Sequence, residues 1–300
     1  MGAEETAREQ NDALSLMRRR YSCRTYDGKL LEPVVMAELA AVAGGQVAGP
    51  FGSQPRISLV SASDGDRGGL RRIGTYGFIS KPAVYLAGIA RHADGVGALE
   101  DVGYVLERAV LSATGLGLGT VWLGGTFTKG RFRRQLKLDG DESLPAVIAL
   151  GYPAERARSA DAVIRRGASA DRRLPWHELF FEVSDDDGLF DLPLTREASG
   201  RYSTALEMVQ LGPSASNKQP WRVVREASLW HLYLRRTPGY RRRNRLVGVA
   251  DMQRLDLGIA MCHFELACRH LGIVGRWVFK DPSLPLPDAL TCYVASWREA

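Results

Sequence analysis

The chain has 300 residues, of which 45% are hydrophobic and 25% charged, a composition typical of a folded globular protein that excludes an intrinsically disordered one. Its apolar runs fall far short of a membrane span, its acidic, polar N-terminus lacks the pattern of a secretory signal, and its net charge of +6 is too diffuse to indicate nucleic-acid binding. The four cysteines show no metal-ligand or paired spacing, so we expect reduced thiols in a cytoplasmic protein.

Alternating helices and strands are predicted along the first half of the sequence. Asp12 is a candidate N-cap for a helix through Met17, and Glu32-Pro33 has the sequence of a second helix start. Apolar periodicity then predicts, in order, strands at 57–60 and 83–87, a long helix at 100–116, and strands at 120–123 and 146–150. These elements together predict a mixed α/β protein.

A basic cluster follows the first predicted helix. It contains Arg20, Ser22 and Arg24, and guanidinium groups together with a hydroxyl are the donors that a phosphate dianion prefers. Arg18 and Arg19 are better explained as a solvated helix end that the helix dipole favours. The cluster is therefore a candidate anion site, with a solvated helix end as the alternative interpretation.

A candidate linker lies at residues 184–194, which are acidic and interrupted by Gly and Pro. After it the sequence pattern begins again. After it, an apolar helical pattern at 205–211 is stopped by Gly212-Pro213, and residues 221–224 are predicted as a strand. The intervening residues 213–219, which we call the polar loop, are small or carry Ser, Asn and Gln side chains that suit a flat polar ligand. On composition alone, a well-capped turn explains the same residues.

An internal repeat links the two parts of the chain. The pattern Asp-x-Gly, Leu, Leu-Gly, Trp runs from Asp101 to Trp122 and recurs without a gap from Asp256 to Trp277, a spacing of 155 residues. Gln54-Pro55 also recurs, as Gln219-Pro220, at a spacing of 165 residues. Each copy predicts a helix that is capped by Asp, packed closely at Gly, and ended by Leu-Gly before a strand.

These motifs resemble those of the FMN-dependent nitroreductase family. The sequence Pro-Ser-x-x-Asn-x-Gln-Pro-Trp at 213–221 is similar to the family's flavin-facing loop, and Arg-x-Ser-x-Arg at 20–24 is similar to its phosphate-binding segment. The glycine-rich segment 115–125 is similar to the strand that passes flavin N5, and 172–176 resembles the basic segment that completes the phosphate site. The resemblance implies an α/β (α+β) nitroreductase-like fold, with a mixed sheet flanked by helices and two fused pseudo-symmetric halves.

The resemblance also implies a set of cofactor-binding residues, with no side chain assigned to acid–base catalysis and no metal ligand. The implied FMN-binding residues are Arg20, Tyr21, Ser22, Arg24, Leu123, Gly124, Gly125, Arg173, Pro213, Ser214, Ala215, Asn217 and Gln219. Flavin N5 would do the chemistry, so the protein would supply position, exclusion and electrostatics.

One composite site is expected, because the family's motifs are divided between the halves. Family members are usually homodimers in which each FMN site combines the arginine arm of one subunit with the loop of the other. Here residues 1–183 keep the arm, the glycine-rich strand and Arg173, whereas residues 195–300 keep the loop. We therefore expect one compact unit, a monomer that is an internal pseudo-dimer, whose pseudo-symmetric second site has lost both of its parts.

The implied activity is transfer of hydride or electrons from NAD(P)H, through FMN, to a small-molecule acceptor such as a nitroaromatic or quinone, with no nucleic-acid or membrane partner. One alternative is a flavin-binding protein without turnover, for storage or sensing. Another is a flavin-free fold that binds nucleic acid or protein through the arginine-rich segment 235–245. His263 and His270 share a helix face, but no carboxylate or further His completes a metal site, so packing and surface roles are favoured.

Overall fold

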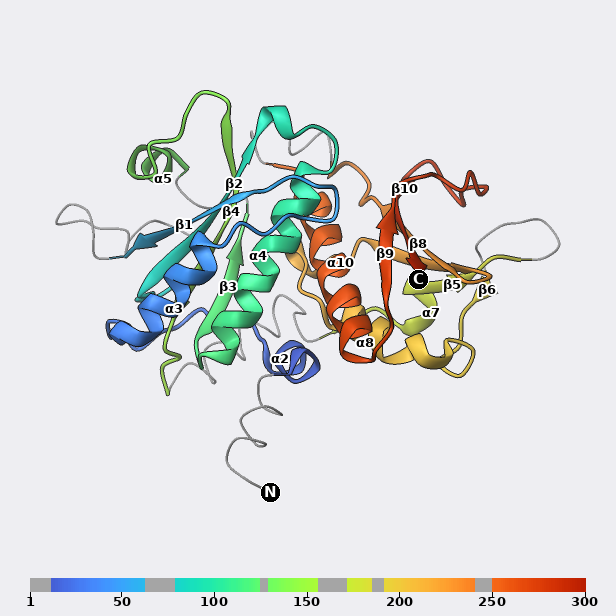
Figure 1. Ribbon diagram of the computed structural model, residues 1–300, viewed down its shortest axis with the longest axis horizontal. Helices are drawn as coiled ribbons and strands as arrows, with labels where there is room; N and C mark the ends of the chain where they lie inside the picture. The colour runs from blue at the N-terminus through green and yellow to red at the C-terminus, as the bar shows by residue number, and fades with distance from the viewer. Residues whose placement is uncertain (1–11, 63–78, 125–128, 156–171, 185–191, 241–249) are drawn as a thin grey trace, which may run out of the picture.

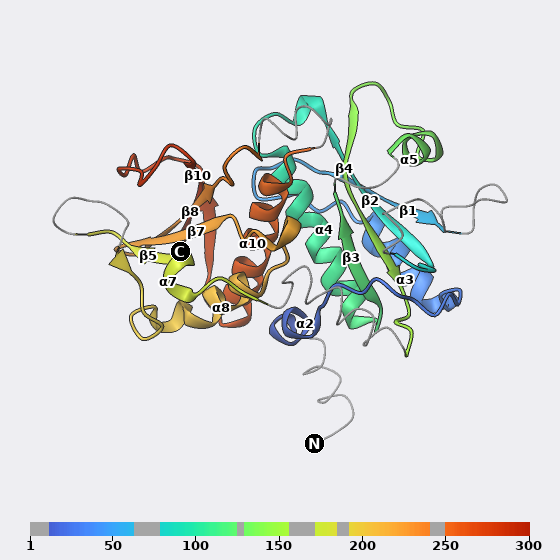
Figure 2. The same cartoon turned by 180° about the vertical axis from the view of Figure 1, so that it is seen from behind.

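The computed structural model describes residues 12–62, 79–124, 129–155, 172–184, 192–240 and 250–300. Gly125, most of the linker candidate and the basic residues 241–245 lie outside these ranges. Within them, two β-sheets lie on either side of a central pair of helices (Figure 1 and Figure 2). The predicted α/β class and the two fused halves are confirmed.

The first half carries a four-stranded antiparallel sheet in the order β1-β2-β4-β3. Its strands are β1 (Arg56–Ser61), β2 (Val84–Arg91), β3 (Gly119–Leu123) and β4 (Glu142–Gly151). Its helical segments are α2 (Ala13–Arg19), α3 (Pro33–Gly44), η2 (His92–Asp94), α4 (Ala98–Gly115) and α5 (Lys129–Gln135). The elements predicted here from apolar periodicity are confirmed, and Asp12 caps α2 by accepting the N–H of Ser15 at 2.9 Å.

The second sheet has six strands in the order β6-β5-β7-β8-β10-β9, and its strand β5 comes from the end of residues 1–183, the range assigned to the first half. Its strands are β5 (Phe180–Glu182), β6 (Leu192–Pro193), β7 (Trp221–Glu226), β8 (Leu229–Arg235), β9 (Gly275–Val278) and β10 (Thr291–Glu299). The accompanying helical segments are α7 (Trp176–Leu179), η3 (Gly200–Tyr202), α8 (Ser203–Leu211), η4 (Ala215–Asn217) and α10 (Met252–His270). The antiparallel run β7-β8-β10-β9 repeats the order β1-β2-β4-β3, and β5 makes the sheet mixed by pairing parallel to β7.

The helices α4 and α10 form the centre of the molecule, side by side in both views (Figure 1 and Figure 2). Their backbones touch at two glycines of the repeat. A Cβ atom on Gly103 would overlap the carbonyl of Leu255, and a Cβ on Gly258 would overlap the carbonyl of Glu100. Since residues 103 and 100 correspond to 258 and 255, the two contacts are related by pseudo-two-fold symmetry. The close packing that the sequence predicted at these glycines is confirmed.

The two helices also end in the same way. The N–H of Leu118 donates to the carbonyl of Ala113 at 3.0 Å, and the N–H of Ile273 donates to that of Cys268 at 2.8 Å. Each end passes through a glycine with positive φ, 76° at Gly117 and 70° at Gly272. This is the hydrogen-bonding pattern of a Schellman C-cap, so the predicted Leu-Gly helix ends are confirmed.

One prediction about the repeat is wrong. Asp101 and Asp256 do not cap their helices, because α4 begins after Gly97 and α10 begins after Asp251. Both aspartates lie inside the helices, and each carboxylate accepts hydrogen bonds from the loop of its own half. They therefore hold loops rather than helix ends.

One apolar core cluster runs through both halves and includes the buried faces of α4 and α10. A second cluster covers the other face of the first sheet. Within the described ranges, no helix has the length and apolarity needed to cross a membrane.

Candidate functional site

The segment Arg20 to Arg24, which we call the arginine arm, runs along the edge strand of the first sheet. Ser22 forms a parallel bridge with Thr120 of β3, and the N–H of Cys23 donates to the carbonyl of Thr120 at 2.8 Å. The guanidinium of Arg24 donates to the carbonyl of Ser22 at 3.4 Å. The structure thus brings the arm beside the strand that ends in Leu123 and Gly124, two segments that are about 100 residues apart in sequence.

Arg20 lies against a buried polar cluster between the two central helices. Its Nε is 3.7 Å from Oε1 of Glu107, and the side chain of Glu107 has no exposed surface. The indole N–H of Trp122 donates to Oε2 of Glu107 at 2.9 Å. Nε2 of His263 is 2.9 Å from Oε1 of Glu107, and its Nδ1 is 2.8 Å from the carbonyl oxygen of Met208 in α8. The cluster therefore joins the arm to α8 and α10 of the second half.

The end of β3 lies under the first turn of α10. Leu123 is buried, and a Cβ atom on Gly124 would overlap the side chain of Met252. The absence of a side chain on Gly124 leaves room for the thioether of Met252. Met252 is the first residue of α10 and lies one turn before Asp256, so the glycine-rich strand meets the part of α10 that holds the polar loop.

The polar loop is fixed by hydrogen bonds and by strained backbone. The N–H of Ala215 donates to Asp256 at 3.0 Å, and Ser214 Oγ accepts the N–H of Gln219 at 2.9 Å. Burial raises the pKa of Asp256 well above its usual value. Ser216, Asn217 and Gln219 have φ of 52°, 52° and 46°, which non-glycine residues adopt at some energetic cost.

The segment Arg172 to Leu174 binds directly to the polar loop. Arg173 donates to the carbonyl of Leu211 at 3.0 Å and to Oδ1 of Asn217 at 3.3 Å. The amide of Asn217 donates to the carbonyl of Arg172 at 2.7 Å, and Oε1 of the buried Gln219 accepts the N–H of Leu174 at 2.8 Å. The late arginine and the loop, assigned by sequence to different halves, are therefore in contact.

The predicted residues thus fall into two groups that meet at α10. The arm and the β3 end form one group, and the late arginine and the polar loop form the other. Tyr21 and Pro213 are half-buried within these groups. Gly125 lies outside the described residues.

The pseudo-symmetric counterpart of this site has a different set of side chains. The residue 155 positions after Gly124 is Phe279, and the residue 155 positions before Met252 is Gly97. The rings of Phe279 and Phe51 are 4.2 Å apart between centroids, inclined by 32°, and a Cβ atom on Gly97 would overlap Phe51. At the counterpart of the Gly124 position, two phenylalanine rings therefore pack against each other beside the start of α4, and Phe279 is 44% exposed.

The first-half loop that carries Phe51 is nevertheless held like the polar loop. The N–H groups of Phe51 and Ser53 donate to the carboxylate of Asp101 at 2.8 and 2.9 Å, as the N–H of Ala215 does to Asp256. Burial raises the pKa of Asp101 as well. The scaffold of the counterpart persists, while Phe279 stands at the position that corresponds to Gly124.

The remaining candidates do not form a site within the described residues. Both ring nitrogens of His263 are engaged, with Glu107 and with the carbonyl of Met208, and Nδ1 of His270 lies 3.9 Å from Oδ1 of Asp12. No group of three or more potential metal-ligating side chains occurs there. Arg236 is buried and pairs with Asp251 at 2.8 Å.

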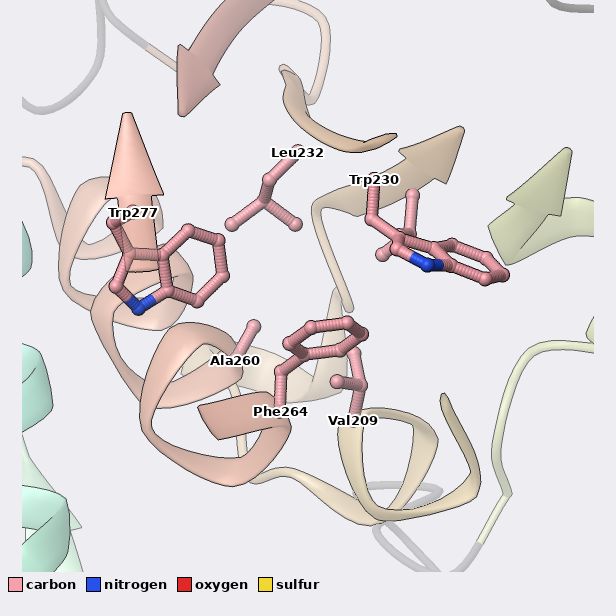
Figure 3. Close-up of a pocket in the computed structure, with 7 residues that line it drawn as sticks. Val209, Trp230, Leu232, Ala260, Phe264 and Trp277 are labelled. Carbon is pink, nitrogen blue, oxygen red and sulfur yellow. The ribbon is translucent and has the colours of Figure 1, made fainter. Parts of the chain in front are cut away.

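A small cavity lies in the second-half core, between α8, α10 and the second sheet (Figure 3). Phe264, Trp230 and Trp277 lie around it, and all of its lining residues are apolar or aromatic. Trp277 directs its indole N–H away, to Glu265 at 2.8 Å. The cavity offers no converging polar groups, so we interpret it as a packing gap.

The residues that sequence reasoning missed are Glu107, Met252 and the loop-holding role of the two repeat aspartates. Glu107 and Met252 carry no local signal, because their partners are Arg20, His263 and Gly124, far away in sequence. The aspartates were visible in the repeat, and their recurrence at the same distance from a glycine was the signal that could have found them.

The fold is nitroreductase-like. The chain resembles the crystal structure of a "putative nitroreductase" from Thermotoga maritima MSB8, with a TM-score of 0.55 and 17% identity over 95% of this chain and 92% of that one. A family model described as "Putative TM nitroreductase" matches residues 12–268, and the chain belongs to this family.

Shorter structures resemble parts of the chain. A nitroreductase family protein of Clostridium difficile 630 has a TM-score of 0.42 and 20% identity over 58% of this chain and 97% of its own. A "putative nitroreductase" from Desulfovibrio desulfuricans in complex with FMN has a TM-score of 0.40 and 24% identity over 48% of this chain and 88% of its own. No curated protein matches the sequence.

Proposed function

We propose that the chain is an FMN-dependent oxidoreductase that takes electrons from NAD(P)H and passes them to a small acceptor such as a nitroaromatic or quinone. Its one FMN site would lie between the arginine arm and β3 end on one side and the polar loop on the other. Family membership and the FMN in the complex from Desulfovibrio desulfuricans support the cofactor.

The contact between Arg172–Leu174 and the polar loop is the observation that carries the proposal. It joins a first-half segment that resembles a phosphate site to the second-half loop that resembles a flavin site, through four hydrogen bonds of 2.7 to 3.4 Å. A purely structural fold would not need both segments to retain their motif residues at one place. These contacts, together with the resemblance, support the proposal of a composite site.

The residues present fit FMN by their chemistry. The guanidinium groups of Arg20 and Arg24 and the hydroxyl of Ser22 would hold the phosphate, and Tyr21 would lie along the ribityl chain. The backbone at Leu123, Gly124 and Gly125 would pass close to the ring. Bound FMN would supply hydride acceptance at N5 and electron transfer to the acceptor.

The polar loop would face the other side of the ring with Pro213, Ser214 and Ala215. Asn217 and Gln219 are engaged with the first-half backbone, so we assign them, together with Arg173, the task of holding the loop in place. Met252 covers the backbone of Gly124 and would shift when the ring binds, which the flexible thioether chain permits.

The setting we propose is a cytoplasmic monomer. All four cysteines are free thiols, and three of them are buried, as expected where thiols stay reduced. The internal pseudo-dimer already supplies both sides of the site, so a second chain is not required. We propose no nucleic-acid or membrane partner.

Anaerobic reduction of the FMN-loaded protein tests the function. We expect NADPH or NADH to bleach the flavin absorbance band, and a nitroaromatic or quinone to restore it. Bound flavin that neither nucleotide reduces would support the alternative of a flavin-binding protein without turnover. A protein that takes up no FMN would refute the flavin function.

A matched pair of arginine variants tests the arm. Arg24→Gln removes a proposed phosphate donor, whereas Arg18→Gln removes a neighbouring arginine that pairs with the surface residue Glu207 at 3.3 Å. We expect the first to weaken FMN binding by about ten- to a hundredfold, since a charge-assisted hydrogen bond contributes about 1.5–3 kcal/mol, and the second to leave it unchanged. Equal effects would place the phosphate elsewhere.

A further inference from the structure

We infer that Glu107 and His263 share one proton behind Arg20, and that the resulting net positive charge makes the site select phosphorylated over unphosphorylated flavin. This inference rests on the proposed FMN function and deepens it. Glu107 and His263 would be positioning residues, since they act on the ligand through Arg20.

The partners of the two ring nitrogens of His263 show where hydrogens must lie. Nδ1 of His263 faces the carbonyl oxygen of Met208 at 2.8 Å, and a carbonyl oxygen only accepts. Nδ1 therefore carries hydrogen. Nε2 of the same ring faces Oε1 of Glu107 at 2.9 Å, so this contact also needs a hydrogen, either on the ring nitrogen or on the carboxyl group.

Either placement of the second hydrogen gives the same total charge. An imidazolium beside a carboxylate sums to zero, and a neutral imidazole beside a protonated carboxyl also sums to zero. Arg20 stays protonated in any protein environment, so the three side chains carry a net charge of +1. All three are buried, with side-chain exposures of 5% for Arg20 and 0% for the other two, so water screens this charge little.

Among the residues that the structure describes, the cluster occurs on the side of the molecule that keeps the arm and not at its counterpart. The residues corresponding to Glu107 and His263 under the 155-residue repeat are Cys262 and Arg108. The indole of Trp277, by contrast, repeats that of Trp122, since it donates to Glu265 as Trp122 donates to Glu107. A shared scaffold alone would favour symmetry, so the asymmetric placement points to a task at the arm.

Variants that change the net charge of the cluster distinguish this role from a purely structural one. His263→Gln keeps a neutral donor toward Glu107 but removes the shared proton, which leaves Arg20 neutralised by an ionised carboxylate. The double substitution His263→Gln with Glu107→Gln restores a net charge of +1. Glu107→Gln alone also keeps +1, because its amide can donate to the bare ring nitrogen.

The readout is the ratio of riboflavin to FMN dissociation constants, measured by quenching of flavin fluorescence on the apoprotein. We expect His263→Gln to lower this ratio about tenfold, since it removes one unit charge near the phosphate. Glu107→Gln and the double variant should keep the ratio within about threefold of wild type. Riboflavin lacks the phosphate, so a general loosening of the site would weaken both ligands and leave the ratio unchanged.

Glu265→Gln is the matched control, because Glu265 also accepts an indole N–H and pairs with the arginine Arg269, away from the arm. It should leave the ratio at the wild-type value. If His263→Gln does not fold, His263→Asn makes the same charge change and should give the same loss. An unchanged ratio in the His263 variant, or a double variant that fails to restore it, would overturn the inference. A wild-type protein that binds neither flavin would instead refute the proposed function.

Discussion

The two glycines where α4 and α10 touch give a specific prediction about the stability of the fold. Gly103→Ala would place a methyl group on the carbonyl of Leu255, and Gly258→Ala would place one on the carbonyl of Glu100. Backbone atoms inside a helix pair cannot rotate away, so the helices must separate. Alanine gains about 1 kcal/mol over glycine in helix propensity, and overpacking costs about 1–3 kcal/mol or more, toward the upper end here. Each variant should lose about 2 kcal/mol.

Urea unfolding followed by circular dichroism measures these losses. Gly44→Ala in α3 is the control, because a Cβ there meets no atom within 4 Å, and it should be neutral or stabilising. Both alanines lie at the same contact between α4 and α10, so the separation of the helices that one alanine forces also makes room for the other. We expect the double variant of Gly103 and Gly258 to lose less than the two single losses combined. Single variants as stable as the control, or fully additive losses, would refute the pseudo-symmetric crossing.

Three further predictions concern the site. Gly124→Ala should weaken FMN binding about tenfold in a fluorescence titration, with little change in stability because the Met252 side chain can move; unchanged affinity would contradict the close approach. Arg173→Ala removes two hydrogen bonds to the loop region, each contributing about 1 kcal/mol, and should weaken FMN binding, whereas equal binding by variant and wild type would count against a loop-holding role. Burial raises the pKa of Asp256, so the folded chain holds its proton more tightly than the unfolded chain, and the free energy of unfolding should fall as pH rises above about 4. Asp256→Asn should lack this part of the pH dependence. Identical pH dependence of urea unfolding in variant and wild type would contradict the assignment.

Local patterns in the sequence predicted most of the fold. Periodicity and turn residues were sufficient for the helices and strands that flank the site, and the 155-residue repeat predicted the contact glycines of α4 and α10 and their Leu-Gly ends. These features depend on neighbours within a few residues or on direct repetition. Asp101 and Asp256 were misassigned, because an aspartate before an apolar run resembles an N-cap, although both helices begin a turn earlier.

The remaining features depend on contacts between distant segments. Nothing near Glu107 indicates that it meets His263 across the helix pair, and His263 was weighed only as a metal ligand or a packing residue. The pairing of β5 with the second-half sheet was also hidden, because three residues carry too little pattern to show a strand's partner. The 155-residue repeat alone places Phe279 at the position of Gly124, but its contact with Phe51 depends on the fold.

The number of FMN molecules bound per chain tests the central claim most directly. Native mass spectrometry of the 33.0 kDa protein with excess FMN would count them. One composite site, with Phe51 and Phe279 packed together at its counterpart, predicts a single FMN on a single chain. Two FMN molecules per chain would show that the counterpart also binds, and FMN bound only by paired chains would show that the two halves of one chain do not complete the site.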